Sequence, residues 1–202
     1  MSLRALRRTA AVTALAGGLV AGLVTPANAA TTTSATTTTV TYTQWQTDVT
    51  AVTAPALAYI QERIAEAAST SKLAVVLDID NTALASYFYS SYPTPADPPV
   101  LALAQYAASK GVKIFFITAR PDVIDLITEY NLKSVGYQVD GLYSRNPIQL
   151  FEAVNTFKTA EREQLESEGY DIIANIGNNT VDIEGGYADS TWELPNYDGL
   201  LD

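Results

Sequence analysis

Nearly continuous apolar runs, separated by segments with helical signals, place the strongest constraint on how this chain can fold. The runs occupy residues 73–77, 112–117 and 172–176 and are rich in Val, Ile and Phe. Such runs are typical of strands in a parallel sheet that is covered on both faces. Parallel neighbours also need a crossover between them, which is usually a helix. We therefore predict an α/β fold, with a doubly wound, mostly parallel sheet and right-handed crossovers.

The segment between the first two runs carries clear helix boundaries. Asp97 is predicted as the N-cap, Pro98 and Pro99 fall in the first turn, and Gly111 follows the end. Apolar residues at helical spacing also predict one or two helices over residues 45–68, ahead of the sheet. The remaining elements are predicted from their end signals: helices over residues 121–135 and from 148 or later to 168, and short strands near 139–143 and over 191–194.

The first 30 residues have the pattern of a cleaved export signal. A basic start containing Arg7 and Arg8 precedes an apolar run over residues 10–24, and small residues follow it. The run is shorter than the roughly 20 residues that a membrane-spanning helix needs. We therefore expect cleavage near Ala29 or Ala30, a secreted, extracellular protein and no membrane attachment after cleavage. The Arg pair leaves open whether the general or the twin-arginine route is used.

Two further segments complete the expected domain organisation. Residues 31–43 are rich in Thr and have little to bury, so we predict a flexible leader there. Residues 44–202 are predicted to form one folded domain, because that length and the apolar content are enough for a core.

The composition excludes several classes of function. The chain has no Cys and no His, so Cys proteases, His-based triads and zinc fingers are ruled out. Any catalysis must use carboxylates, hydroxyls, Lys or a hard metal ion. With 22 acidic against 12 basic residues the formal charge is -10, and the folded part has no basic stripe. We therefore expect neither nucleic acid nor anionic membranes as partners.

Polar residues follow three of the predicted strands at the point where each strand ends. They occupy residues 78–82, 118–120 and 177–182. Because the carboxyl ends of parallel strands meet at one edge of a sheet, we expect these residues to face one crevice. Lys158 and Arg162, four residues apart, share one face of the helix before the last of these strands.

Phosphoryl transfer is the chemistry that this set of residue types suits. Asp78 can attack phosphorus as a nucleophile if Mg²⁺ and a Lys ammonium neutralise the phosphoryl oxygens, which gives an aspartyl phosphate. Asp80 can protonate the leaving oxygen and then deprotonate water. The Thr118 hydroxyl and the backbone at Ala119 can hold phosphoryl oxygens.

Metal ligands are available at the same strand ends. Asn178 and Asp182 offer hard oxygen atoms of the kind that Mg²⁺ prefers. The alternative is that these two residues form only a turn and a helix cap. Thr118 has a comparable alternative as the cap of the following helix. Arg120 and Arg162 are predicted to be structural and to pair with nearby acids.

At these positions the chain resembles the haloacid dehalogenase (HAD) superfamily, and within it the secreted acid phosphatases related to plant vegetative storage proteins. The resemblance spans about residues 59–196. It rests on five segments in the order typical of the family: LDIDNTAL (77–84), FFITAR (115–120), FKTAEREQLESEGYDI (157–172), IANIGNNTVDIEGG (173–186) and ELPN (193–196).

The resemblance implies a role for each candidate residue. Asp78 would be the nucleophile, Asp80 the acid and base, and Lys158 the charge that steadies Asp78 and phosphate. Thr118, with Ala119, would bind phosphate oxygens. The Mg²⁺ site would combine Asp78, the backbone carbonyl of Asp80, Asn178 and Asp182. The activity implied is that of an acid phosphatase acting on small phosphomonoesters.

Two departures from the family pattern bear on function. The family usually has Asp where this chain has Asn178, so we expect weaker Mg²⁺ affinity and not an inactive enzyme. The segment over residues 83–99 is shorter than in relatives, which predicts a much reduced cap. Its aromatic residues, Tyr87, Phe88 and Tyr89 among them, form either a small lid over the substrate or a packed Pro-rich loop.

Two other functional classes remain open on the sequence. One is a HAD-like phosphate-binding, storage or interaction protein with weak or no turnover. The other is a phosphoacceptor receiver domain, which also carries Asp, Thr and Lys at strand ends. Receiver domains lack the second acid, here Asp80, and an exported protein would not meet a cytosolic kinase.

Overall fold

A five-stranded parallel sheet forms the centre of the domain. The computed structural model describes residues 39–202, so the predicted export signal and most of the predicted leader lie outside the described residues. The strand order is β3-β2-β1-β4-β5, and every neighbouring pair is parallel. The strands are β1 (Lys72–Leu77), β2 (Lys113–Pro121), β3 (Gly141–Arg145), β4 (Tyr170–Gly177) and β5 (Thr191–Glu193). The predicted doubly wound α/β fold is confirmed.

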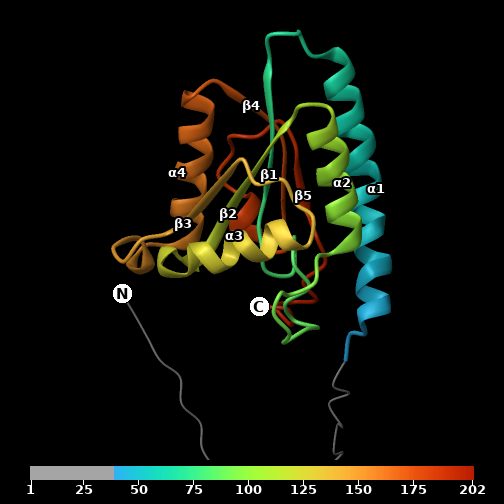
Figure 1. The fold of residues 1–202 in the computed structure, drawn as a ribbon, viewed down its shortest axis with the longest axis vertical. Helices are drawn as coiled ribbons and strands as arrows, with labels where there is room; N and C mark the ends of the chain where they lie inside the picture. Colours follow the sequence, from blue (N-terminus) through green and yellow to red (C-terminus); the bar gives the residue numbers. More distant parts are fainter. Residues whose placement is uncertain (1–38) are drawn as a thin grey trace, which may run out of the picture. The chain divides into compact units, whose positions relative to one another are not determined.

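Helices cover both faces of this sheet (Figure 1). They are α1 (Tyr42–Glu66), α2 (Pro98–Ser109), α3 (Asp125–Ser134), α4 (Val154–Ser167) and the short α5 (Thr180–Ile183), with 3-10 turns η1 (Asp122–Ile124) and η2 (Gln149–Phe151). α1 and α2 pack on one face, where Val75 and Leu77 of β1 point. α4 packs on the other face, against Ala74 and Val76. Successive side chains of a strand point to opposite faces, so a strand buried on both sides is apolar throughout.

Several element boundaries differ from the sequence-based prediction. α1 is one continuous helix that begins at Tyr42, where Thr41 caps it, three residues before the range over which one or two helices are predicted. β2 continues past its predicted end at residue 117, because its pairing with β3 resumes at Pro121 and Arg145 after a register shift. For the same reason α3 begins at Asp125, later than predicted.

α4 begins at Val154, within the range predicted for this helix, which was from residue 148 or later, and a separate turn, η2, precedes it. The Arg145 guanidinium donates hydrogen bonds to the backbone carbonyls of Gln149 and Glu152. The Gln149 carbonyl also accepts from the backbone N–H of Glu152 at 3.0 Å, which closes the turn η2. Arg145 therefore stabilises this turn ahead of α4, which starts at Val154. In residues 39–202, no helix has the length and apolar character needed to cross a membrane.

Asp97 stands at the N-cap position of α2 as predicted, but its carboxylate makes no capping hydrogen bond. Its side chain is fully buried. Oδ1 accepts a hydrogen bond from the Gln46 amide of α1 at 2.7 Å, while Oδ2 is buried without a partner. The carboxylate thus links α1 to α2 and leaves one of its oxygens unsatisfied.

This buried carboxylate makes the stability of the domain depend on pH. Burial raises the pKa of Asp97 to about 7, although the hydrogen bond from Gln46 acts to lower it. A group whose pKa is higher in the folded state stabilises the fold when protonated, and that contribution is lost as pH rises toward the folded-state pKa. We expect the free energy of unfolding to fall by on the order of 2–4 kcal/mol between about pH 5 and pH 7.5 through this group.

The variant Asp97→Asn tests this dependence. Its neutral amide should remove this part of the slope and raise the free energy of unfolding at pH 7.5 by on the order of 2 kcal/mol. Urea unfolding at the two pH values measures both effects. Glu62→Gln, on an exposed part of α1, is the matched control and should leave the slope unchanged. Equal stability of Asp97→Asn and the parent chain at pH 7.5 would contradict the prediction.

Candidate active site

A cavity of about 290 Å³ opens at the carboxyl ends of β1, β2 and β4. Parallel strands bring their carboxyl ends to one edge, and ligands commonly bind there. All seven residues singled out in the sequence line this cavity: Asp78, Asp80, Thr118, Ala119, Lys158, Asn178 and Asp182. The prediction that three strand ends face one crevice is therefore confirmed.

β1 places Asp78 at the base of the cavity. The backbone N–H of Asp78 donates to the carbonyl of Ile176 at 2.9 Å, which continues the pairing of β1 with β4 by one residue. The side chain is only 9% exposed. Asp78 therefore sits on rigid, doubly covered sheet, and little of its carboxylate is hydrated.

A buried lysine joins two carboxylates at the centre of the site. Lys158 Nζ, from α4, donates to Asp78 Oδ1 at 2.6 Å and to Asp182 Oδ1 at 2.6 Å. The two oxygens therefore lie no farther apart than twice that distance. The Lys158 side chain is 2% exposed, so the contacts are shielded from water. The predicted contact between Lys158 and Asp78 is present.

The charges in this cluster do not balance. Burial raises the pKa of Asp78 to about 7, although Lys158 acts to lower it. Burial acts to lower the pKa of Lys158, but Asp78 and Asp182 outweigh it and hold that pKa above its usual value. When the pH is above the pKa of Asp78, one ammonium faces two carboxylates, and the net negative charge of the cluster favours the binding of another cation.

Asp80 lies nearer the mouth of the cavity and is held by Arg120. The guanidinium donates to both carboxylate oxygens, from Nε at 2.8 Å and from Nη2 at 2.7 Å. It also donates to the Thr128 hydroxyl of α3 at 3.3 Å. Burial acts to raise the pKa of Asp80, yet the hydrogen bonds from Arg120 hold it below its usual value. The prediction that Arg120 pairs with a nearby acid is confirmed.

Thr118 and Ala119 lie within β2 and not at a helix start. The Thr118 side chain is buried, and its hydroxyl accepts a hydrogen bond from the backbone N–H of Arg120 at 3.2 Å. Since α3 begins only at Asp125, the alternative that Thr118 caps that helix is wrong. The hydroxyl lines the cavity and remains free to donate its own proton to an oxygen there.

The loop after β4 gives Asp182 two tasks. Its Oδ2 accepts from the backbone N–H of Asn179 at 2.9 Å, which completes a capping box at the start of α5. Its Oδ1 binds Lys158. The capping alternative for Asp182 is thus correct but incomplete. The Asn178 side chain contacts the Thr82 hydroxyl through Oδ1 at 3.3 Å and also lines the cavity.

Arg162 corrects one prediction. It is fully buried, but it does not pair with an acidic side chain among the described residues. Instead it donates to the backbone carbonyls of Asp182 at 2.8 Å and Gly186 at 2.9 Å, and to that of Glu184. Arg162 therefore fastens the loop that carries Asp182 onto α4.

A glycine allows the close approach of Asp182. A Cβ placed on Gly177 would lie 2.3 Å from the Cβ of Asp182, a distance that packed atoms do not tolerate. The family segment over residues 173–186 thus has a steric reason to begin its polar part with glycine.

Six further residues line the cavity besides the seven predicted ones: Asn81, Val154, Asn179, Val181, Leu201 and Asp202. Asn81, directly after Asp80, has a left-handed backbone with φ 55° and donates from Nδ2 to the Leu201 carbonyl at 2.6 Å. Leu201 and Asp202 line the cavity as well. Asn81 falls inside a family segment, so its position could have been noticed. Nothing in the sequence signals that residues 201 and 202 return to the strand ends.

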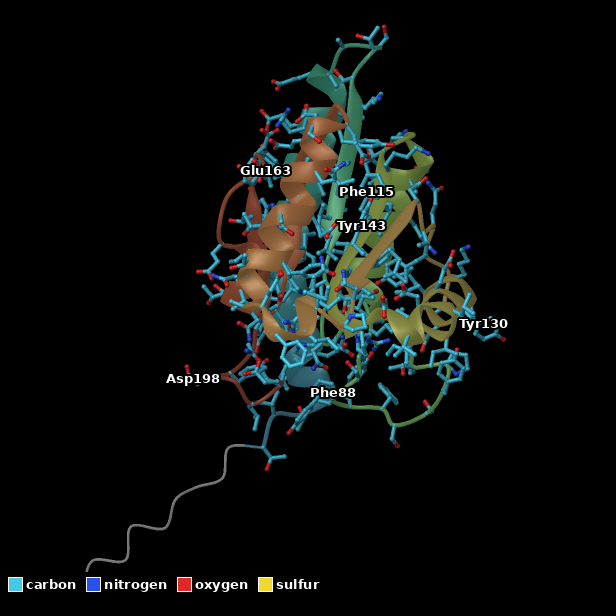
Figure 2. The ribbon with its side chains drawn as sticks, turned by 90° about the vertical axis from the view of Figure 1, so that its left-hand side faces the viewer. Phe88, Phe115, Tyr130, Tyr143, Glu163 and Asp198 are labelled. Carbon is cyan, nitrogen blue, oxygen red and sulfur yellow. The ribbon has the colours of Figure 1, made fainter. Side chains whose placement is uncertain are left out.

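The aromatic residues of the short segment after β1 lie outside the cavity lining. Phe88 stacks on Trp45 of α1 with ring centroids 4.9 Å apart. Tyr92 stacks on Tyr130 of α3 and donates to the Ile127 carbonyl. Figure 2 shows Phe88 and Tyr130 at the same end of the domain. Of the two alternatives for this segment, the structure matches the packed loop.

The donor set fits a hard divalent cation. In residues 39–202, no three His, Cys, Asp or Glu side chains come close enough to hold a metal by themselves. The cavity instead combines the carboxylates of Asp78 and Asp182 with the amide oxygen of Asn178. Oxygen donors of this mixed kind suit Mg²⁺, which binds through one or two carboxylates and keeps several waters.

The chain matches one family model and is similar to several plant proteins. Residues 19–95 and 92–200 match the family model described as HAD superfamily, subfamily IIIB (acid phosphatase). The Stem 28 kDa glycoprotein of Glycine max is 34% identical over 121 residues, which are 57% of this chain and 47% of that protein. Vegetative storage protein 1 of Arabidopsis thaliana is 29% identical over 122 residues, which are 58% and 44%. The chain thus spans less than half the length of these two relatives.

A solved structure shares the fold. The class C acid phosphatase from Bacillus anthracis aligns with a TM-score of 0.57 at 22% identity, over 72% of this chain and 67% of that one. At this identity the likeness concerns the fold alone. The family match covers most of the chain, including all seven predicted residues of the cavity, and ends before Leu201 and Asp202. The chain therefore belongs to the HAD superfamily, subfamily IIIB, the acid phosphatase subfamily.

Proposed function

We propose that this protein is a secreted, Mg²⁺-dependent phosphomonoesterase that acts through an aspartyl-phosphate intermediate. One observation carries the proposal: the Asp78 and Asp182 carboxylates flank the Lys158 ammonium at 2.6 Å each, in a cavity also lined by Thr118. A carboxylate beside fixed positive charge and a hydroxyl donor is the arrangement that nucleophilic attack on a phosphate ester requires.

In the first step, Asp78 forms a bond to phosphorus and the bond from phosphorus to the ester oxygen breaks. Negative charge on the phosphoryl oxygens repels an approaching carboxylate. The Lys158 ammonium, which contacts Asp78, reduces this repulsion. The Thr118 hydroxyl and the N–H groups at the end of β2 hold the phosphoryl oxygens in line. The product is phosphate bound covalently to Asp78.

Asp80 manages the protons of both steps. It gives a proton to the leaving oxygen, and then accepts one from the water that releases phosphate from Asp78. Arg120 orients this carboxylate but favours its ionised form, so the guanidinium has to yield a hydrogen bond when Asp80 is protonated.

Asp78, Asn178, Asp182 and the backbone carbonyl of Asp80 are the groups that would hold Mg²⁺. When bound, the ion neutralises phosphoryl charge beyond what Lys158 supplies. The surplus negative charge around Lys158 supports this assignment.

Small phosphomonoesters are the proposed substrates. The cavity of about 290 Å³ accommodates a phosphoryl group with a modest leaving group, and no cap segment lines it among residues 39–202. Export of the chain and its release from the membrane are part of the proposal and rest on the sequence pattern of residues 1–30. A storage or phosphate-binding role without turnover is the alternative, since one relative is called a storage protein.

A substrate screen separates these functions. The purified full chain should release inorganic phosphate from p-nitrophenyl phosphate and from alkyl phosphates when Mg²⁺ is present, and not with EDTA. Asp80→Asn should lower the rate by about 10²–10⁴-fold for alkyl phosphates, and less for p-nitrophenyl phosphate, whose leaving oxygen needs no proton.

The control variant is Asp140→Asn. Asp140 pairs with Lys113 at the amino end of β2, away from the cavity, so it should retain activity toward both substrates. A parent chain that binds phosphate and Mg²⁺ but turns over no ester would favour the alternative.

A further inference from the structure

The last residues of the chain form part of the cavity that holds the candidate Mg²⁺ site. Leu201 and Asp202 line it together with Asp78, Asn178 and Asp182. They belong to none of the segments on which the family resemblance rests, and they follow the last of these by several residues.

Two asparagines fix this part of the chain to the strand ends. Asn81, in the loop after β1, donates to the Leu201 carbonyl at 2.6 Å, and the Leu201 side chain is 1% exposed. Asn179, in the loop after β4, donates from Nδ2 to Asp202 Oδ1 at 2.9 Å. Residues 201 and 202 therefore bridge the loops that carry Asp78 and Asn178.

The chain turns sharply to reach this position. Tyr197 and Asp198 have left-handed backbones, with φ of 53° and 58°, and Gly199 follows with φ 84°. Two consecutive non-glycine residues rarely adopt this conformation, and it persists where surrounding contacts enforce it. Figure 2 shows Asp198 at the same end of the domain as Phe88, the end that carries the carboxyl ends of the strands. Packing of Leu201 and hydrogen bonds from Asn81 and Asn179 thus hold Asp202 at the cavity.

The charge of Asp202 is not neutralised by a contact in the described part of the chain. Its Oδ1 accepts from two neutral amides, those of Asn179 and Asn196, each at 2.9 Å. By contrast, Asp80 pairs with Arg120, and Asp78 and Asp182 share Lys158. Asp202 is exposed and therefore adds a negative charge at the solvent side of the cavity lining. It is held by Asn179, the neighbour of Asn178, where an amide replaces the usual carboxylate of the family.

We propose that Asp202 supplies, through its electric field, the negative charge that Asn178 lacks, and so strengthens the binding of the divalent cation. Two amides hold Asp202 Oδ1 in place, and Asp202 is not among the proposed ligands, so the proposal concerns its charge and not a bond to the ion. The inference rests on the Mg²⁺ site of the proposed function. A nearby carboxylate in a partly hydrated site changes the affinity for a doubly charged ion by about three- to tenfold.

The test measures metal binding and not activity. Isothermal titration of the full chain with Mg²⁺, and with Mn²⁺ followed by electron paramagnetic resonance, gives dissociation constants for each variant at one ionic strength. Asp202→Asn should weaken binding by about three- to tenfold. Asn178→Asp should strengthen it, and adding Asp202→Asn to Asn178→Asp should weaken it again by about the same three- to tenfold factor.

Two controls separate charge from structure. Asp202→Glu keeps the charge and should bind within about twofold of the parent chain. Asp198→Asn removes a charge from the same turn but outside this cavity, and should leave the dissociation constant unchanged. Thermal unfolding of each metal-free variant shows whether the fold is intact; Asp202→Asn retains the oxygen that accepts from the two amides.

The outcomes distinguish the inference from the function it rests on. If the parent chain binds Mg²⁺ and Asp202→Asn binds it equally well, the inference is wrong and the metal site stands. If the parent chain binds neither cation, both the inference and the Mg²⁺ part of the proposed function are overturned.

Discussion

The variant Asp78→Asn is expected to lower the turnover of phosphomonoesters by at least about a thousandfold, because an amide cannot replace the carboxylate as nucleophile. The shape of the side chain is kept, and the amide oxygen can still accept a hydrogen bond from Lys158. Removing one of two carboxylates that share a single ammonium also relieves buried charge. We therefore expect the fold to be retained, with a free energy of unfolding no lower than that of the parent chain.

Steady-state hydrolysis of p-nitrophenyl phosphate measures the loss. Intact mass after acid quenching supplies an independent readout, since the parent chain should carry one covalently bound phosphoryl group during turnover and the variant none. Asp140→Asn again serves as the carboxylate control remote from the cavity. Turnover within tenfold of the parent chain in Asp78→Asn, with no deamidation detected, would exclude Asp78 as the nucleophile.

The second large effect concerns stability. Lys158→Met should lower the free energy of unfolding by about 3–5 kcal/mol in metal-free buffer at pH 8, because it leaves two buried carboxylates without their cation. Hydrolysis should fall as well, since the charge against Asp78 is gone. Urea unfolding in the presence of EDTA measures the stability change.

A double variant identifies the cause of that loss. In the Asp78→Asn background, Lys158→Met leaves only one uncompensated carboxylate, Asp182, and should cost clearly less. Lys133→Met removes an exposed lysine paired with Glu129 on α3 and should change stability by no more than about 0.5 kcal/mol. Equal losses from Lys158→Met in both backgrounds would show that packing of the Lys158 stem, and not charge, accounts for the effect.

Much of the fold could be predicted from the sequence, because burial on both faces leaves a direct trace in it. β1 is apolar after Lys72, and the buried part of β4 is apolar except for Asn175. α2 is marked by prolines at its start and a glycine after its end. The ends of elements were harder to predict where tertiary contacts decide them. β2 continues to Pro121 because β3 pairs with it there. The turn η2 is stabilised by hydrogen bonds from Arg145 to the backbone carbonyls of Gln149 and Glu152.

In the candidate site, too, the residue types could be predicted from the sequence, while contacts that depend on tertiary structure could not. Asp78, Asp80, Thr118, Lys158 and Asp182 could be found because chemistry of this kind is attached to strand ends and to one helix face. The partner of Arg162 was predicted wrongly, since backbone carbonyls carry no signature in a sequence. Asp97 was predicted as a helix cap, and its hydrogen bond to Gln46 depends on how α1 lies against α2. Asp202 reaches the cavity only through the backbone turn at Tyr197 and Asp198.

The cluster of Lys158, Asp78 and Asp182 can form only when distant parts of the chain have folded together. Lys158 meets Asp78 across 80 positions of the chain and Asp182 across 24, so neither contact can form within a local segment. A chain in which β1, α4 and the loop after β4 have not yet docked has an ordinary, hydrated aspartate at position 78. Recovery of the proposed activity during refolding would therefore require that these long-range contacts have formed, and a chain that lacks them would not hydrolyse phosphomonoesters.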